Sequence, residues 1–197
     1  MESVRWDWPL FEVMNFDGGE LFDALMSAVS GVALWIPFYL LILALVWRKY
    51  GFKGLLLFLL SVGVAMGVSD LVAGIFKHSG PLAELWPSFP VRPRPMFTEG
   101  LKNLHVVSFD HGRYGTVSAH AATIVSLALL SSLIIARRWF TVVVTVVAVA
   151  VCYSRIYLAC HFPQDILLGS LVGVISAIFG YIIFRLLGKI WGVSSVK

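Results

Sequence analysis

The chain has 197 residues, of which 59% are hydrophobic and only 13% are charged. A soluble globular domain carries about 25% charged residues, so the composition excludes an ordinary water-soluble domain and indicates an integral membrane protein, read here as a single domain over residues 1–197. The net charge of +4 does not indicate nucleic-acid binding, because the basic residues form no continuous stripe and stand mostly at the ends of apolar segments.

The first predicted element is an interfacial amphipathic helix near residues 6–16, within an interfacial segment 1–18, where aromatic and aliphatic side chains alternate with acids. Five apolar segments follow, and each is long enough to cross a hydrocarbon core, which takes about 20 helical residues. They lie near 21–47, 54–76, 119–136, 139–157 and 164–187.

The predicted fold is therefore all-α: an integral membrane helical bundle of five to six transmembrane helices plus the N-terminal amphipathic helix. The total becomes six or seven helices if the N-terminal stretch and the start of the first segment are counted separately. Two Gly-x-x-x-Gly patterns, Gly63 to Gly67 and Gly169 to Gly173, lie inside segments. We interpret them as close helix packing within one chain, with dimerisation as the alternative.

The charges predict the orientation of the bundle. One face carries basic residues and no acid: Arg48, Lys49, Lys53, Arg137, Arg138, Arg185, Lys189 and Lys197. By the positive-inside rule this face is cytoplasmic. The turn 155–165 and the loop 77–118, which we expect to be an active-site loop, then share the outer face. We expect a multi-pass membrane protein whose outer face, with this loop, lies toward the periplasm or the outside.

The turn before the last segment carries an arginine, a histidine and a carboxylate in a fixed register: Ser154-Arg155, then His161, then Asp165. Pro163 suits the first turn of a helix, so His161 is expected at the mouth of that helix with Asp165 one turn below. A carboxylate so placed can accept the imidazole N–H and raise the basicity of the other nitrogen. The alternative is a helix cap beside an incidental interfacial histidine.

Two further groups are expected at the same outer face. Ser118 is a natural N-cap of the third apolar segment, and the small Ala119 lets an anion approach the N–H groups of that helix start, beside His120. The alternative is a capped helix with a surface histidine. The basic residues Lys77, Arg92, Arg94 and Arg155 lie where positive charge is disfavoured, and arginine binds phosphate oxygens in bidentate fashion. An isolated Lys77 would more commonly snorkel.

Together these groups resemble the signature of the type 2 phosphatidic acid phosphatase superfamily, which reads K-x6-R-P, then P-S-G-H, then S-R-x5-H-x3-D. The third block is matched in full by Ser154, Arg155, His161 and Asp165. In the second, Ser118 and His120 match while Val117 and Ala119 replace proline and glycine. In the first, sixteen residues instead of six separate Lys77 from Arg94, and Arg92 also precedes a proline.

The resemblance implies a phosphatase of a bacterial inner membrane, with its active site facing the periplasm or the outside, that needs no metal and no cofactor. His161 would attack phosphorus, Asp165 would orient it, and His120 would protonate the leaving oxygen. The phosphoryl oxygens would be held by Lys77, Arg94 (or Arg92), Arg155, Ser118 and the N–H groups around Ala119. Phosphoryl transfer depends mainly on positioning and electrostatic stabilisation, which fixed basic groups can supply.

A phosphatase embedded in a bilayer should act on a membrane lipid phosphate. We expect undecaprenyl diphosphate first, with a lipid A phosphate or phosphatidylglycerophosphate as alternatives. Two other classes stay open: a metallohydrolase whose ligands would be His105, His111, His120, His161 and Asp165, and an anion or lipid transporter. The sequence leaves the oligomeric state open.

Overall fold

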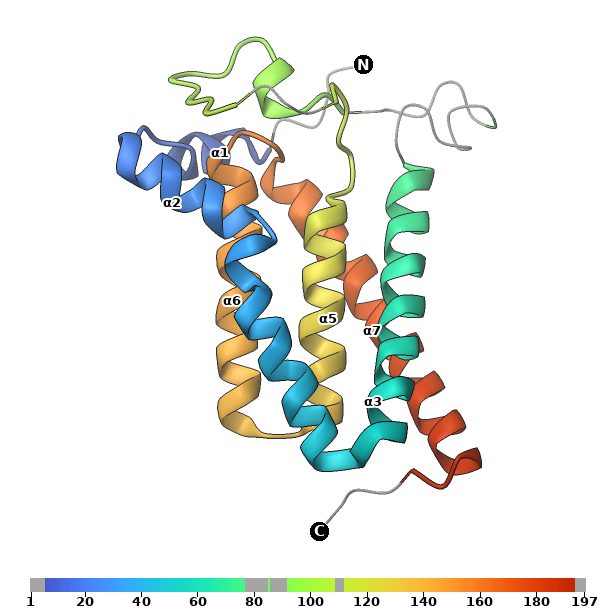
Figure 1. Cartoon of the computed structure of the whole chain (residues 1–197). Coiled ribbons are helices and arrows are strands. Elements are labelled where there is room, and N and C mark those ends of the chain that lie inside the picture. The colour runs from blue at the N-terminus through green and yellow to red at the C-terminus, as the bar shows by residue number, and fades with distance from the viewer. Residues whose placement is uncertain (1–5, 77–84, 86–91, 109–111, 194–197) are drawn as a thin grey trace.

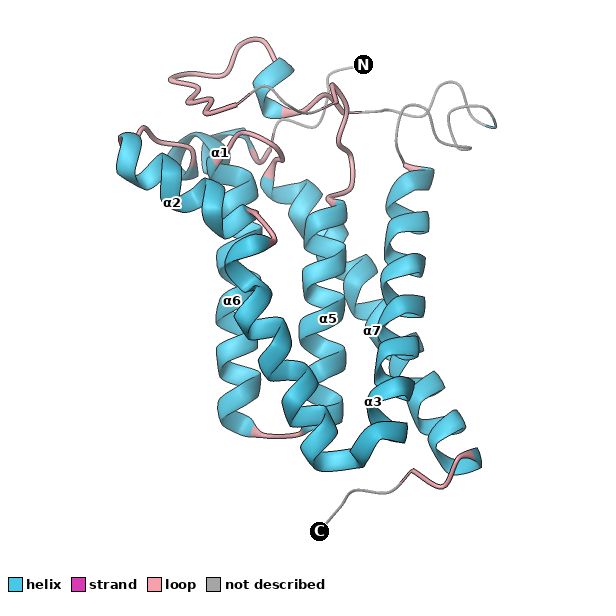
Figure 2. Ribbon diagram, viewed as in Figure 1, coloured by secondary structure: helices cyan, strands magenta, loops and turns pink. Residues whose placement is uncertain are grey.

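The computed structural model describes residues 6–76, 85, 92–108 and 112–193, and within these ranges every regular element is a helix (Figure 2). The sole pairing of strand type in this part of the chain is an isolated bridge between Pro93 and Tyr114. The elements are α1 (Trp8–Met14), α2 (Glu20–Ser30), η1 (Ala33–Trp35), α3 (Ile36–Ile75), η2 (Pro95–Phe97), α5 (Ala119–Ile135), α6 (Arg138–Tyr157) and α7 (Pro163–Ile190). The predicted all-α bundle is confirmed.

Helix α3 is folded back on itself at Gly51, where the backbone has φ 67°. Glycine adopts this left-handed conformation without the steric cost that a Cβ brings, so the chain reverses here and the two limbs, 36–50 and 52–75, run in opposite directions (Figure 1). Three helices are long and apolar enough to cross a membrane, and one of them is this folded pair, Ala33–Ile75. With the shorter apolar α5, the bundle has five apolar limbs.

The first predicted span, 21–47, is divided, and its start forms the separate helix that the higher predicted helix count allows. Residues 20–30 form the separate helix α2, which lies with α1 across the head of the bundle (Figure 1). Gly31 ends α2 in an extended conformation (φ −81°, ψ 157°), and the crossing helix begins only after it. The N-terminal amphipathic helix is likewise shorter than predicted: α1 has seven residues and buries Phe11.

The centre of the bundle is α5, which packs against α3, α6 and α7. Gly169 and Gly173 let α7 approach α5 closely, since a Cβ on them would lie 2.4 Å from the Ser118 carbonyl oxygen and 2.5 Å from that of Ala122. The intrachain interpretation of this pair is confirmed. It is wrong for Gly63 and Gly67, whose added Cβ atoms would have nothing within 4 Å.

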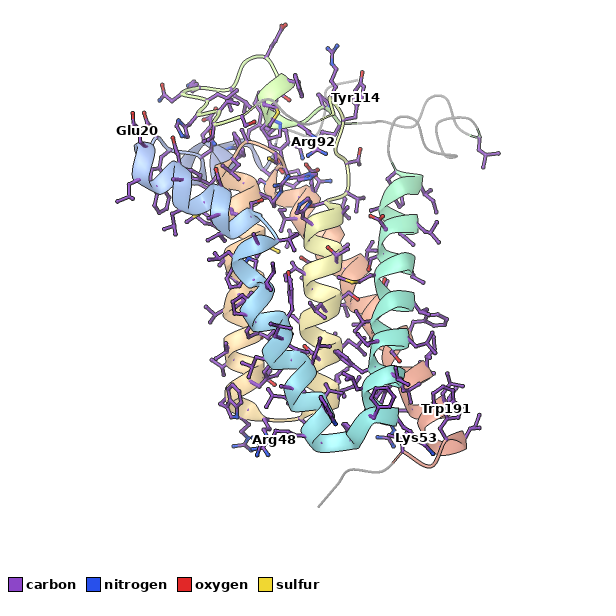
Figure 3. All side chains as sticks on the ribbon, viewed as in Figure 1. Glu20, Arg48, Lys53, Arg92, Tyr114 and Trp191 are labelled. Carbon is purple, nitrogen blue, oxygen red and sulfur yellow. The ribbon has the colours of Figure 1, made fainter. Side chains whose placement is uncertain are left out.

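The two ends of the bundle carry different charges. Arg48 and Lys53 lie at one end and Glu20, Arg92 and Tyr114 at the other (Figure 3). Lys49 belongs to the first end, where its Nζ donates to the last carbonyls of α5. The loop that ends at residue 118 and the turn between α6 and α7 both lie at the second end (Figure 1), as the charge pattern predicts.

Candidate active site

The turn between α6 and α7 gathers three of the predicted residues in a buried position. The backbone reverses at Ala159, which has the left-handed φ of 53°, and the N–H groups of Cys160 and His161 both donate to the carbonyl of Arg155. Arg155, His161 and Asp165 are exposed by only 4%, 3% and 1%. A charged residue is rarely so buried without a partner, so the contacts of this turn decide what it can do.

The imidazole of His161 is held by both ring nitrogens. Its Nδ1 lies 3.2 Å from the carbonyl oxygen of Gly115, and its Nε2 lies 3.0 Å from Nη1 of Arg94. A guanidinium can only donate, so Nε2 accepts and the ring proton is assigned to Nδ1, which donates to Gly115. The lone pair of the ring therefore lies on Nε2, where it accepts the Arg94 N–H.

Asp165 has a different first partner from the one expected. Its Oδ2 accepts the backbone N–H of Phe162 at 2.9 Å, closing the first turn of α7, and lies 3.6 Å from His161 Nδ1. The Gly115 carbonyl thus takes the hydrogen bond that the sequence assigns to Asp165. The carboxylate remains close enough to act electrostatically on the imidazole.

The surroundings keep His161 neutral. Burial lowers its pKa well below the usual value, and the positive charges of Arg94 and Arg155 lower the pKa further, against a smaller opposing effect of the Gly115 carbonyl. A neutral imidazole has the lone pair that a nucleophile requires. Cys160 is no competing nucleophile, because burial raises the pKa of its thiol and the thiol form is unreactive.

Arg94 reaches His161 because two arms of the long loop pair with each other. The Arg94 N–H donates to the Arg113 carbonyl and the Gly115 N–H donates to the Arg92 carbonyl. Nη1 of Arg94 also donates to the carbonyl of Cys160. Gly115 keeps this crossing uncrowded, since a Cβ there would lie 3.0 Å from both Arg94 Cγ and His161 Cε1.

Arg92, the other candidate for the first block, has different partners. Its guanidinium binds both carboxylate oxygens of the fully buried Asp7, at 2.6 and 3.0 Å, and stacks 3.7 Å above the Phe162 ring. Asp7 also accepts the backbone N–H of Gln164 at the start of α7. Arg92 therefore joins the N-terminal segment to α7, with Asp165 3.9 Å away.

Three more of the predicted residues, Ser118, Ala119 and His120, lie at the start of α5. Ser118 caps α5, accepting the N–H of Ala121, and its own N–H donates to the carbonyl of Asp165. His120 is exposed, and its charge contributes to lowering the pKa of His161, so the two imidazoles lie within electrostatic reach. Ala119 lines a groove together with His120. Lys77 lies outside the described residues.

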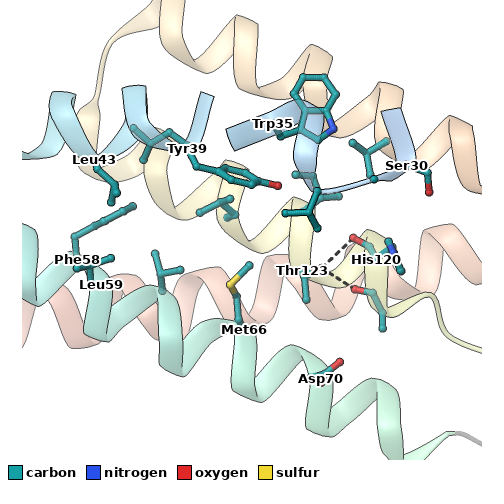
Figure 4. A pocket seen from close by; sticks show the side chains of 18 residues that line it. Ser30, Trp35, Tyr39, Leu43, Phe58, Leu59, Met66, Asp70, His120 and Thr123 are labelled. Atoms are coloured by element: carbon teal, nitrogen blue, oxygen red, sulfur yellow. Dashed lines mark hydrogen bonds between the residues drawn. The ribbon is translucent and has the colours of Figure 1, made fainter. Parts of the chain in front are cut away.

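That groove descends from the site into the bundle. Its volume is about 520 Å³, and the two limbs of α3 together with α5 line it (Figure 4). Ser30, Asp70 and His120 stand at its polar end, while Leu43 and Phe58 mark the apolar end. Along α3 the distance from Phe58 to Asp70 corresponds to ~18 Å at 1.5 Å per residue, close to half of a hydrocarbon core of ~30 Å.

Three contributors to the site were not predicted. Asp7 comes from the N-terminal segment, and Ser30 ends α2, where its hydroxyl accepts a hydrogen bond from Arg155 Nη1. Gly115 contributes a backbone carbonyl. The available signals were weak: a single acid in an apolar stretch, a serine before Gly31, and a glycine near the second block. Within the described ranges no three His, Cys, Asp or Glu side chains gather as a metal site would need, and His105 instead pairs with Asp23.

Comparison with known proteins shows the family of the chain. The model of the PAP2 superfamily matches residues 58–189. A lipid A 4'-phosphatase of Bacteroides thetaiotaomicron is 25% identical over 85% of this chain and 72% of its own length, and one of Porphyromonas gingivalis is 26% identical over 92% and 74%. An undecaprenyl-diphosphatase of Sulfolobus acidocaldarius is 23% identical over 87% and 75%. The crystal structure of Aquifex aeolicus LpxE shares the fold, with a TM-score of 0.60 at 20% identity over 87% of this chain and 92% of that one.

Proposed function

The chain belongs to the PAP2 superfamily and is a membrane lipid phosphatase, and we propose that it hydrolyses its substrate through a covalent phosphohistidine at His161. The observation that carries the proposal is the 3.0 Å contact between Nη1 of Arg94 and Nε2 of His161, the ring nitrogen that bears the lone pair. An arriving phosphoryl oxygen can accept that guanidinium N–H in place of Nε2, which frees the lone pair for phosphorus.

The proposed reaction has two steps. Nε2 of His161 attacks the terminal phosphorus, the bond from that phosphorus to the bridging oxygen of the lipid or lipid monophosphate breaks, and a protonated His120 gives its proton to that oxygen. Neutral His120 then takes a proton from water, whose oxygen displaces Nε2 and releases inorganic phosphate. Arg94 and Arg155 stabilise the charge on the phosphoryl oxygens in both steps, with Lys77 and the α5 start as further donors.

The groove supports a lipid as the substrate. It begins at His120, where the leaving oxygen would sit, and its apolar part runs about one leaflet deep (Figure 4). A phosphate at the head of the bundle can thus be held while its hydrocarbon chain lies between the limbs of α3 and α5. Lipid A phosphates and undecaprenyl diphosphate both fit this description, and relatives named for each resemble the chain.

Trapping the intermediate tests the mechanism. Purified protein mixed with a lipid carrying radiolabelled phosphate and quenched in alkali should retain label that acid removes, as a phosphohistidine does. His161→Ala should abolish the label and lower phosphate release about 10³-fold or more, and His120→Ala should retain the label longer. Near-normal turnover by His161→Ala would refute the covalent scheme.

His105→Gln is the matched control, and its loss of activity together with chelator sensitivity would favour a metallohydrolase.

We also propose that the site faces away from the cytoplasm, in a bacterial inner membrane. The support is the acid-free basic end of the bundle, which carries Arg48 and Lys53 opposite the site (Figure 3). In intact cells whose outer membrane has been opened, a membrane-impermeant maleimide should label Glu99→Cys and spare Lys53→Cys. The reverse labelling would invert the orientation.

A further inference from the structure

A second, polar cavity adjoins Arg155 at the carboxyl-terminal end of α2. Its volume is about 300 Å³, which is at the lower end of the range of ligand pockets and suits a group of monosaccharide size. Three serine hydroxyls and one guanidinium line it beside the apolar side chains of Leu158 and Cys160. The lining residues are Ser27, Ser30, Gly31, Ser108, Arg155, Leu158 and Cys160.

The polar cavity and the apolar groove meet at two residues. Ser30 and Gly31 line both spaces, and Nη1 of Arg155 donates to Ser30 at this meeting point. Because the Ser30 oxygen accepts from Arg155, its own O–H proton is directed to another acceptor. Arg155, a proposed phosphate ligand, therefore lines the polar cavity next to its junction with the apolar groove.

We propose that the polar cavity is a subsite for a hydroxylated, sugar-like group that carries both the scissile phosphate and the acyl chains. The inference rests on the proposed phosphatase function and selects the substrate class. Serine hydroxyls both donate and accept, so they match the hydroxyls of a sugar ring, while the acyl chains enter the groove beyond Ser30. A diphosphoprenol has no hydroxyl between phosphate and tail and would leave the three serines unused.

The test compares the activity of one double variant on two substrates. Ser27→Ala/Ser108→Ala removes two hydroxyls and leaves Ser30, which contacts Arg155, in place. With an acylated glucosamine phosphate in mixed micelles, kcat/KM should fall about tenfold, mostly through KM, as expected for the loss of two neutral hydrogen bonds. With a diphosphoprenol, kcat/KM should stay within about twofold.

The controls separate this inference from the function it rests on. Ser27→Thr/Ser108→Thr, which keeps both hydroxyls, should recover most of the activity on the sugar lipid, and Thr141→Ala at the opposite end should change neither substrate. Equal losses on both lipids, or no loss on the sugar lipid, would overturn the subsite while leaving the phosphatase function intact. Failure of the unmodified protein to release phosphate from either lipid would overturn the proposed function and the subsite with it.

Discussion

The contact between Asp7 and Arg92 allows the sharpest test of how the N-terminal segment supports the site. The Asp7 carboxylate has no exposed surface and accepts three hydrogen bonds, two from Arg92 and one from the N–H of Gln164. Asp7→Asn keeps the shape of the side chain and removes its charge. The guanidinium of Arg92, exposed by only 10%, then loses its main counter-ion.

The expected cost follows from this burial. Removing one partner of a buried ion pair costs about 3–5 kcal/mol. Arg92 keeps the Phe162 ring and a second carboxylate, Asp165, at 3.9 Å, so we expect the lower end, about 3 kcal/mol. For a domain of this size each kcal/mol shifts Tm by about 2–4 °C, which predicts a fall of about 6–12 °C.

Thermal unfolding in detergent measures this fall, and a double-mutant cycle isolates the pair. Arg92→Met alone leaves a buried carboxylate and should be as damaging as Asp7→Asn, whereas the double variant should be more stable than the sum of the two losses predicts, by about 1.5 kcal/mol or more. Asp17→Asn, an exposed acid of the same segment, should cost less than about 1 kcal/mol. A coupling energy below about 0.5 kcal/mol would show that the pair does not fasten the segment.

The helices could be predicted where the length of an apolar segment and the residues at its ends define them. Residues 119–135, 138–157 and 163–190 form helices close to the predicted segments, because Ser118, Pro163 and the Arg137-Arg138 pair mark boundaries locally. The start of the first span could not be predicted. An interfacial helix and a crossing helix have similar compositions, and only the extended backbone at Gly31 separates them.

The site was predictable where a side-chain pattern marks a helix end. Arg155, His161 and Asp165 come together through one turn, as their register indicates. The contributions of Asp7 and Gly115 could not be predicted, for two physical reasons. A backbone carbonyl acceptor leaves no signature in residue type, and Asp7 meets Arg92 across 85 positions of sequence, a separation that local patterns do not constrain.

Three further predictions concern the site itself. Gly115→Ala places a Cβ 3.0 Å from Arg94 and His161 and should lower kcat/KM about tenfold or more, because small displacements of reacting groups are costly. Gly112→Ala, with open space around it, is the control. Equal activity of the two variants would contradict the close approach of Arg94 and His161 at Gly115. Arg94→Ala should lower kcat, whereas Arg92→Ala should act mainly through stability, and equal tolerance of both in a phosphate-release assay would remove Arg94 from the site. The acid limb of kcat/KM should lie below pH ~6.5, the ordinary histidine value, because burial and then Arg94 lower the pKa of His161. The unfolded chain takes up this proton first, so the stability contributed by His161 is full above pH ~6.5 and falls as the pH drops below it. Arg94→Gln removes one of the positive charges that lower the pKa of His161 and should move the acid limb of the kcat/KM profile to higher pH. An acid limb that stayed fixed or moved to lower pH would show that it does not report the titration of His161.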